Sequence, residues 1–435
     1  KVVVLIDGEH RPEVTAEAVS KINETYQVVA AVCVGGTEKL ERGYSFEMLC
    51  VPVIMAFDYM HGLRHIIDSY KPERVVDLSD DPVLDHAKRF TIASQVIAMG
   101  IIYSGSDFVF MPATSRFSSK KASISIIGTG KRVGKTAISG FFARTLSKRF
   151  EPIVVSLGRG GPEKPEVIYG GKMEITPEFL LSLSAQGKHA SSDYLENALT
   201  SKVTTIGGRR CGGGLCGQAY LSNIDKCVHL ANTIPGNIVL FEGSGSSIPD
   251  VVTDRQVLVI GAYQPLTNIV QYLNPAKVIN SHLVVLTMCE KPIADEKQIY
   301  AMENAIRSIN PEVSIIKTTF RPIPLSDIKN KCIILCTTSS RSGLHNIIRY
   351  LEDMHQCIVV ASTNRLSDRV ALQEDLMSFQ HIDADMMLTE LKAAAVDVVT
   401  AWGIAKGLEV GYMDNQPLCL QPGFNFEEEI FRIAK

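Results

Sequence analysis

Residues 123–149 contain the feature that most constrains how this chain can fold: a strand-like run, a glycine-rich loop and a helix-like segment in immediate succession. The loop reads Gly-Thr-Gly-Lys-Arg-Val-Gly-Lys-Thr at positions 128–136. It follows the apolar run Ser123–Ile127 and precedes the helical pattern of Ile138–Arg149. Glycines let backbone N–H groups converge on phosphate oxygens, and the N-terminus of the next helix adds its dipole. This order predicts a nucleoside triphosphate site on an α/β fold.

Within this loop we expect Lys135 to reach the β- and γ-phosphates of ATP and the Thr136 hydroxyl to ligate Mg²⁺. A strict G-x-x-x-x-G-K-T motif needs glycine at position 129, where threonine stands. The register instead resembles the loop of dethiobiotin synthetase, in the P-loop branch related to MinD and nitrogenase iron protein. A glycine-rich turn without a ligand is the alternative, which the strand and helix on either side disfavour. The residues predicted to contact the nucleotide are Gly128, Gly130, Lys131, Arg132, Val133, Gly134, Lys135, Thr136 and Ala137.

Short apolar runs alternate with helical stretches along the whole chain, which predicts α/β architecture with mainly parallel sheets. A length of 435 residues allows two or three domains. We predict an N-terminal α/β domain over 1–118, ending in a serine-rich connector at 115–122, and a P-loop domain over 119–325. The segment 158–224 reads as a long, strand-poor insertion at one end of the sheet. The α/β region 326–435 either continues the P-loop sheet or forms its own lobe.

The charge balance excludes broad classes of partner. Lys plus Arg number 44 and Asp plus Glu 47, a net charge of −3, whereas general nucleic-acid and membrane-surface binders carry a basic excess. The chain shows no signal peptide and no apolar run of membrane-spanning length, and its ten cysteines follow no framework spacing, so we expect a reducing cytoplasm. Cys211 and Cys216 could suggest a metal or a disulfide, but we favour plain small side chains.

Three further segments carry residues suited to phosphoryl transfer. Glu242 ends the apolar run Ile238–Phe241, where P-loop enzymes hold Mg²⁺; a carboxylate that caps a turn is the alternative. Arg159 begins an Arg-Gly-Gly turn after the run Ile153–Leu157, and Arg209–Arg210 lies among five glycines. Such segments suit anions, although each could also be a solvated loop.

Because three basic, glycine-rich segments recur in one unit, we predict a cleft for the γ-phosphate and a second phosphorylated substrate. The candidate catalytic residues are Lys131, Lys135, Arg159, Arg209 and Arg210. The candidate substrate-binding residues are Arg159, Gly160, Gly161, Lys164, His189, Arg209, Arg210 and Ser244. Taken singly, His189 and Asp193 are more typical of structural residues. In the first domain, Asp7–Arg11 is read equally well as a binding or hinge segment and as a simple turn, and Asp80–Asp81 as a helix-capping cluster.

Taken together, these motifs resemble the cyclic 2,3-diphosphoglycerate synthetase family. The resemblance rests on L-I-D-G-E-H at 5–10, the loop at 128–136, G-R-G-G-P-E-K-P-E at 158–166, G-K-H-A-S-S-D-Y at 187–194, G-G-R-R-C-G-G-G at 207–214, F-E-G-S-G at 241–245 and T-E-L-K-A-A-A-V-D at 389–397. It implies an enzyme of heat-loving methanogenic archaea that closes 2,3-diphosphoglycerate into a ring at the expense of ATP, with Mg²⁺ and K⁺.

Two alternatives remain at this point. One is another P-loop ligase or kinase that uses ATP on a small anionic substrate. The other is a nucleotide-operated switch protein, which would not need Arg159, Arg209 and Arg210. A homodimer is expected by analogy with P-loop relatives.

Overall fold

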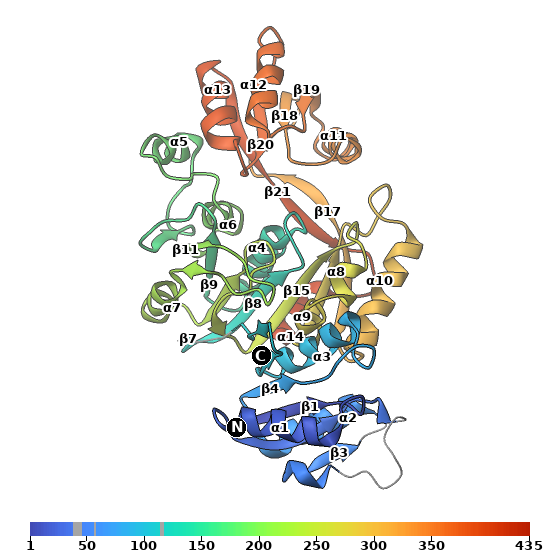
Figure 1. Ribbon diagram of the computed structural model, residues 1–435. Helices are drawn as coiled ribbons and strands as arrows, with labels where there is room; N and C mark the ends of the chain where they lie inside the picture. Colours follow the sequence, from blue (N-terminus) through green and yellow to red (C-terminus); the bar gives the residue numbers. More distant parts are fainter. Residues whose placement is uncertain (38–45, 56–57, 114–116) are drawn as a thin grey trace.

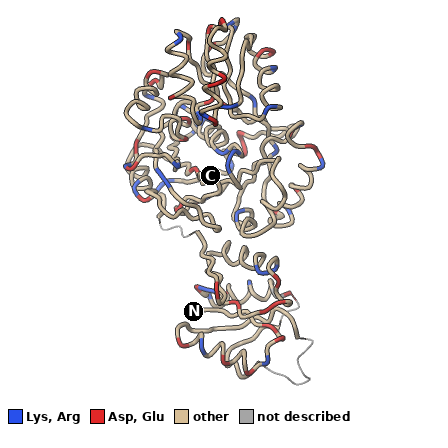
Figure 2. Tube along the Cα trace, turned by 45° about the horizontal axis from the view of Figure 1, so that its top comes forward, with Lys and Arg blue, Asp and Glu red and all other residues tan. Residues whose placement is uncertain are grey.

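The computed structural model describes residues 1–37, 46–55, 58–113 and 117–435. The N-terminal residues form their own sheet at the bottom of Figure 1, and the rest of the chain is built on a second, longer sheet. Acidic and basic residues are intermingled along the trace in Figure 2, in keeping with the near-neutral charge. Within the described residues, no helix is both long and apolar enough to cross a membrane. The predicted α/β class, with a P-loop-type parallel sheet and an additional N-terminal α/β unit, is confirmed.

The N-terminal sheet has the strand order β3-β2-β1-β4-β5-β6, and only β6 is antiparallel. Its strands are β1 (Val2–Ile6), β2 (Val28–Cys33), β3 (Val53–Met55), β4 (Arg74–Asp77), β5 (Ile102–Ser104) and β6 (Val109–Phe110). The helices are α1 (Pro12–Asn23), α2 (Tyr59–Tyr70) and α3 (His86–Ala98), with a 3-10 turn η2 at Glu47–Leu49. β1 is wholly apolar and fully buried because parallel strands are covered on both faces.

The central part of the second sheet has the order β10-β11-β9-β13-β8-β15-β16-β17, parallel except for β10. Its strands are β8 (Ala122–Gly128), β9 (Pro152–Gly158), β10 (Glu166–Tyr169), β11 (Thr204–Cys211), β13 (Ile238–Glu242), β15 (Arg255–Gly261), β16 (Leu283–Thr287) and β17 (Ser314–Pro324). The short strands are β7 (Phe117–Ser118), β12 (Leu221–Ser222) and β14 (Val251–Val252). The helices are α4 (Lys135–Leu146), α5 (Pro177–Ala185), α6 (Asp193–Ser201), α7 (Ile224–Thr233), α8 (Thr267–Val270), α9 (Pro275–Ile279) and α10 (Glu296–Ile309).

The C-terminal residues extend the same sheet. β17 pairs antiparallel with β21 (Glu409–Cys419), beyond which the order is β20-β18-β19. The remaining elements are β18 (Cys332–Cys336), α11 (Arg341–His355), β19 (Ile358–Thr363), α12 (Arg369–Ser378), β20 (Met386–Glu390), a π-helix η3 (Ala395–Thr400), α13 (Ala401–Ala405) and α14 (Phe426–Ile433). α14 packs back on α4, where the ring centroids of Phe141 and Phe426 lie 5.1 Å apart. Residues 326–435 therefore continue the P-loop sheet and do not form a separate lobe with a sheet of its own.

The description of 158–224 as strand-poor is wrong. β11 is a strand of the main sheet, paired in parallel with β9. The sequence did not indicate this strand, because Gly207 and Gly208 interrupt the apolar pattern of β11. Both glycines are required by packing: a Cβ on Gly207 would lie 2.6 Å from the Tyr194 ring of α6, and one on Gly208 would lie 2.6 Å from Cys227 Sγ of α7. Close contact with helices on both faces, rather than flexibility, accounts for the glycines. The serine-rich connector lies partly outside the described residues; its described part contains the short strand β7, and its last residue, Ala122, begins β8.

Candidate active site

The glycine-rich loop joins β8 to α4 at the carboxyl edge of the parallel sheet, as the sequence predicts. Gly134 precedes the helix with a positive φ of 89°, and a Cβ there would lie 2.4 Å from the ring of Phe320 on β17. Lys135 is buried, and its Nζ donates to the carbonyl oxygen of Gly130 at 2.6 Å. Burial lowers the pKa of Lys135 to about 8, although Glu242 and Asp193 favour its charged form. The Lys135 side chain thus bends back onto the glycine-rich loop that it follows.

The other loop side chains fix the loop to its surroundings or face solvent. The Thr129 hydroxyl, at the position where the strict motif has glycine, donates to Gln264 after β15. Arg132 Nη2 donates to Ser367 Oγ at 3.2 Å, which connects the loop to the C-terminal part of the sheet. Lys131 is exposed. Sequence reasoning did not find Gln264, which lies 135 positions away from Thr129.

Glu242 lies at the carboxyl end of β13 with its side chain buried. Its Oε1 accepts a 2.7 Å hydrogen bond from Thr136 Oγ1. Its Oε2 accepts 2.8 Å bonds from Ser156 Oγ and Asn197 Nδ2. Burial, and next the negative charge of Asp193, raise the pKa of Glu242 to about 7. The structure therefore brings together the two predicted metal-ligating residues and adds Ser156 and Asn197, which the sequence did not indicate.

The oxygens of Thr136 and Glu242 fit Mg²⁺, which takes one or two protein oxygens and completes its shell with water and phosphate oxygens. Among the described residues, no group of three or more His, Cys, Asp or Glu side chains could hold a metal ion by itself. A cation at this position would therefore depend on the nucleotide for part of its coordination. Cys211 is exposed and Cys216 packs on the N-terminal core, so neither indicates a metal site.

Arginines from two of the basic segments converge on the loop after β13. Arg210 is buried, and its Nη2 donates to the carbonyl oxygen of Ser244 at 2.5 Å. A Cβ on Gly245 would lie 2.6 Å from Arg159 Nη2 and 3.2 Å from Arg210 Nη2, so both guanidinium groups border this glycine. Burial and then the charge of Arg159 lower the pKa of Arg210. Arg210 Nε is buried without a hydrogen-bond partner.

Arg209 does not share this position. Successive side chains of a strand point to opposite faces, and the Arg209 side chain, 40% exposed, lies 3.8 Å from Glu163. Lys164 is exposed. His189 lies over Gly160, where a Cβ would come within 2.8 Å of its ring, and Gly161 packs against the backbone of β11. Of the adjacent arginines, only Arg210 borders the loop after β13.

A cavity of about 290 Å³ opens beside Arg210. It is of a size for a small ligand. Its polar lining comes from β11, β12, the first turn of α7 and the loops that follow β11 and β13; these residues are Arg210, Gln218, Tyr220, Ser222, Asp225, Ser244, Ser247 and Asp250. The predicted substrate residues Arg210 and Ser244 therefore lie in the wall of a real cavity.

Lys392, from the motif at 389–397, connects the C-terminal part of the sheet to α6. Its Nζ lies 3.2 Å from Glu196 Oε1, on the helix that also carries Asn197. Burial raises the pKa of Glu196 to about 8, although the Lys392 charge opposes this. This pair helps to hold α6 beside Glu242.

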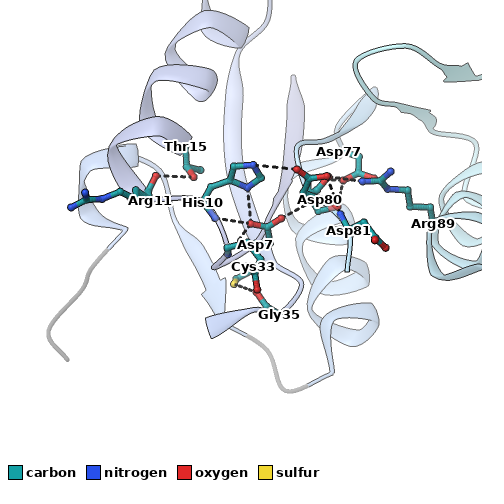
Figure 3. Close-up of polar contacts among 12 residues, drawn as sticks. Asp7, His10, Arg11, Thr15, Cys33, Gly35, Asp77, Asp80, Asp81 and Arg89 are labelled. Atoms are coloured by element: carbon teal, nitrogen blue, oxygen red, sulfur yellow. Dashed lines mark hydrogen bonds and ion pairs between the residues drawn. The ribbon is translucent and has the colours of Figure 1, made fainter. Parts of the chain in front are cut away.

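Polar side chains in the turns after β1 and β4 of the N-terminal sheet bond to one another and to the backbone of these turns (Figure 3). Asp7 Oδ1 accepts from the backbone of Glu9 and lies 2.7 Å from His10 Nδ1, while its Oδ2 accepts from the backbone of Asp80 at 2.6 Å. These bonds tie the turn after β1 to the turn after β4, as the turn interpretation of Asp7–Arg11 requires. The capping role expected for Asp80–Asp81 is wrong, because Asp85 is the N-cap of α3.

Family models match nearly the whole chain. A model described as "Cyclic 2,3-diphosphoglycerate synthetase, N-terminal domain" matches residues 1–111. The P-loop domain model of the same family matches 123–319, and its C-terminal domain model matches 324–416. The chain belongs to the cyclic 2,3-diphosphoglycerate synthetase family. The family resemblance that the motifs indicated is thereby confirmed.

Full-length relatives agree with this assignment. The cyclic 2,3-diphosphoglycerate synthetase of Methanothermus fervidus is 41% identical and covers 100% of this chain and 97% of its own. Those of Thermococcus kodakarensis (44%; 100% and 98%) and Thermococcus onnurineus (45%; 96% and 94%) are similar. Among solved structures, LpxK from Aquifex aeolicus in complex with ATP aligns with a TM-score of 0.47 and 12% identity, over 80% of this chain and 96% of its own.

Proposed function

We propose that this protein converts 2,3-diphosphoglycerate to cyclic 2,3-diphosphoglycerate with ATP, releasing ADP and phosphate. The observation that carries the proposal is a set of cations without counter-ions. Among the described residues, no carboxylate lies within ion-pair distance of Lys135, Arg159 or Arg210, and carbonyl oxygens accept the hydrogen bonds of Lys135 and Arg210. Lys135 and Arg210 are buried and Arg159 is exposed, and three cations without a described carboxylate within ion-pair distance suit a ligand with several phosphate charges.

The reaction needs one substrate phosphate to be activated before the other can displace a leaving group from it. In the first step, an oxygen of one substrate phosphate attacks the γ-phosphorus of ATP, the bond to the bridging oxygen breaks, and ADP leaves. In the second, an oxygen of the other substrate phosphate attacks the phosphorus of the activated one. The ring closes, and the former γ-phosphoryl group leaves as inorganic phosphate. That phosphate carries one oxygen from the substrate.

The residues of this chain would act chiefly through charge and position. Lys135, with Lys131 at the mouth of the loop, offsets charge on the transferring phosphoryl group. Arg159 and Arg210 offset the repulsion between the two substrate phosphates as they are brought together. Bound Mg²⁺, held by Thr136 and Glu242, would supply further positive charge to the phosphate oxygens. Peripheral contacts to substrate are proposed for Gly160, Gly161, Lys164, His189, Arg209 and Ser244.

Because β11 is part of the sheet, residues 158–224 as a whole cannot act as a mobile cover. We assign the exclusion of water to the loop after β11, whose Gln218, Ala219 and Tyr220 line the cavity beside Arg210. A K⁺ requirement, a homodimer and a cytoplasmic location are further parts of the proposal. The K⁺ requirement rests on the family resemblance, the homodimer on analogy with P-loop relatives, and the location on the cysteine usage of the chain.

The decisive experiment measures ADP formation with and without 2,3-diphosphoglycerate. Stimulation by the substrate, with the cyclic product detected by ³¹P NMR, is expected. ATP hydrolysis indifferent to the substrate would favour the nucleotide-operated switch instead. ATP labelled with ¹⁸O in the γ-phosphoryl group tests the order of steps: phosphate that retains three labelled oxygens and gains one from substrate supports the mechanism, and phosphate that gains its fourth oxygen from water refutes it.

Two single variants distinguish the roles of the adjacent arginines Arg209 and Arg210. Arg210→Met is expected to raise the KM for 2,3-diphosphoglycerate strongly and to leave ADP affinity within about twofold, because Arg210 lines the cavity. Arg209→Met, its neighbour on the opposite face of β11, is expected to have the smaller effect. Equal effects of the two changes would contradict the assigned geometry.

A further inference from the structure

Lys277 on α9 is a buried lysine that no motif pointed to. Only 5% of its surface is exposed, and its Nζ donates to the carbonyl oxygen of Ser246 at 2.8 Å. Ser246 belongs to the loop after β13 that Arg159 and Arg210 border through Gly245. Among the described residues, no carboxylate lies within ion-pair distance of this ammonium.

An ammonium buried against a carbonyl alone is poorly compensated for its lost hydration. Burial, and after it the positive charge of Lys135, lower the pKa of Lys277 to about 8. The positive charge of Lys135 thus acts on Lys277, although the two lysines lie far apart in the sequence. An anion placed between them would relieve both the repulsion and the missing counter-charge.

The residues just before Lys277 are held by the N-terminal unit. The carbonyl oxygen of Tyr272 accepts a 2.7 Å hydrogen bond from Ser94 of α3, and its ring meets that of Phe90 edge-on at 5.4 Å between centroids. Leu273 and Ala276 are buried in the core of the N-terminal sheet. The N-terminal unit therefore fixes the backbone of 272–276, and the side chain of the next residue, Lys277, reaches the loop after β13.

We propose that Lys277 is a further cation of the phosphate site, that it supplies positive charge to the γ-phosphoryl group of the nucleotide, and that the N-terminal unit positions it through residues 272–276. This gives the N-terminal unit a role in the chemistry without a ligand of its own. The inference rests on the nucleotide site of the proposed function and not on the identity of the second substrate.

Lys277→Met tests the first part by calorimetric titration with ADP and with a non-hydrolysable ATP analogue, each with Mg²⁺. The analogue is expected to bind about tenfold more weakly than to the wild type, and ADP within about twofold, since ADP lacks the γ-phosphoryl group. The melting temperature is expected not to fall, because an uncompensated buried charge is removed. Lys277→Gln takes its place if the methionine variant does not fold.

Lys121→Met is the matched control. Within the part of the chain that the structure describes, Lys121 Nζ also donates to carbonyl oxygens alone, those of Ala231 and Ile234, but it lies at the amino end of β8, opposite the glycine-rich loop. The Lys121→Met variant should bind ADP and the ATP analogue with wild-type affinity. Equal losses for ADP and the analogue in Lys277→Met, or no loss for either, would overturn the role of Lys277. Both outcomes are read without 2,3-diphosphoglycerate, so they are independent of a failure of the proposed reaction.

Leu273→Ala tests the positioning by the N-terminal unit. It is expected to weaken analogue binding severalfold in the wild-type background and to have no such effect in Lys277→Met, because both changes would act through one ammonium. A loss of the same size in both backgrounds would show that the N-terminal unit does not act through Lys277.

Discussion

Replacement of Glu242 by glutamine should stabilise the fold at alkaline pH while it impairs the proposed Mg²⁺-dependent reaction. Burial, followed by the charge of Asp193, raises the pKa of Glu242 from its ordinary value of 4.5 to about 7 in the folded protein. At about 1.4 kcal/mol per pH unit, the wild type loses up to roughly 3 kcal/mol of stability as the pH rises from below 4.5 to above 7. The folded state favours protonated Glu242, and this form is lost as the pH rises through that range.

Glutamine does not titrate, so it makes no pH-dependent contribution to stability, and the neighbouring side chains can hydrogen-bond to its amide group. The hydroxyls of Thr136 and Ser156 can rotate to accept a hydrogen bond, and Asn197 Oδ1 is buried without a partner. A flip of the Asn197 amide would let that oxygen accept from the new side chain. We therefore expect Glu242→Gln to gain up to about 3 kcal/mol over the wild type at pH 8.5, and most of this gain to vanish below pH 5.

Urea unfolding at pH 5 and pH 8.5, without Mg²⁺ or nucleotide, measures the difference. Glu390→Gln is the control: this buried carboxylate ends β20, and although burial opposes it, Lys392 and hydrogen bonds from Thr338 and Asn415 lower its pKa. That variant should lose stability at pH 8.5. If the stability of Glu242→Gln relative to the wild type does not increase with pH, the electrostatic account of this site is refuted.

Three other substitutions test the loop and its support. Lys135→Met should lower ATP turnover by at least about a thousandfold without loss of stability, measured by ADP formation and thermal unfolding, because no carboxylate of the described residues lies within ion-pair distance of its buried charge. Lys392→Met should destabilise the protein by about 3 kcal/mol in urea, because the buried carboxyls of Glu390 and Glu196 lose their counter-charge; a loss as large in a background that carries both Glu196→Gln and Glu390→Gln would contradict this. Gly134→Ala should abolish measurable nucleotide binding, since φ is 89° and the added Cβ would collide with Phe320; titration with ADP gives the answer, and wild-type affinity would disprove the steric argument.

Features encoded within a few consecutive residues could be predicted from the sequence. The run at 2–6 is a strand with those bounds, and Asp295 caps the helix Glu296–Ile309 through its bond to the backbone of Gln298. The glycine-rich loop lies between its strand and helix for the same reason: strand apolarity, cap chemistry and loop glycines are local. β11 could not be predicted, because its glycines are required by close packing against α6 and α7, and this packing is a tertiary contact.

The sequence alone determined that the chain has an α/β fold, a phosphate-binding loop and a family relationship that its motifs share. Only the tertiary structure decided which charged residues meet. It placed Arg210 against the loop after β13 and turned Arg209 away, because neighbours on a strand face opposite sides. It surrounded Glu242 with Ser156 and Asn197, and it brought Lys277 to Ser246 across 31 positions. These contacts depend on how strands from distant parts of the chain are ordered in one sheet, and no local pattern records that order.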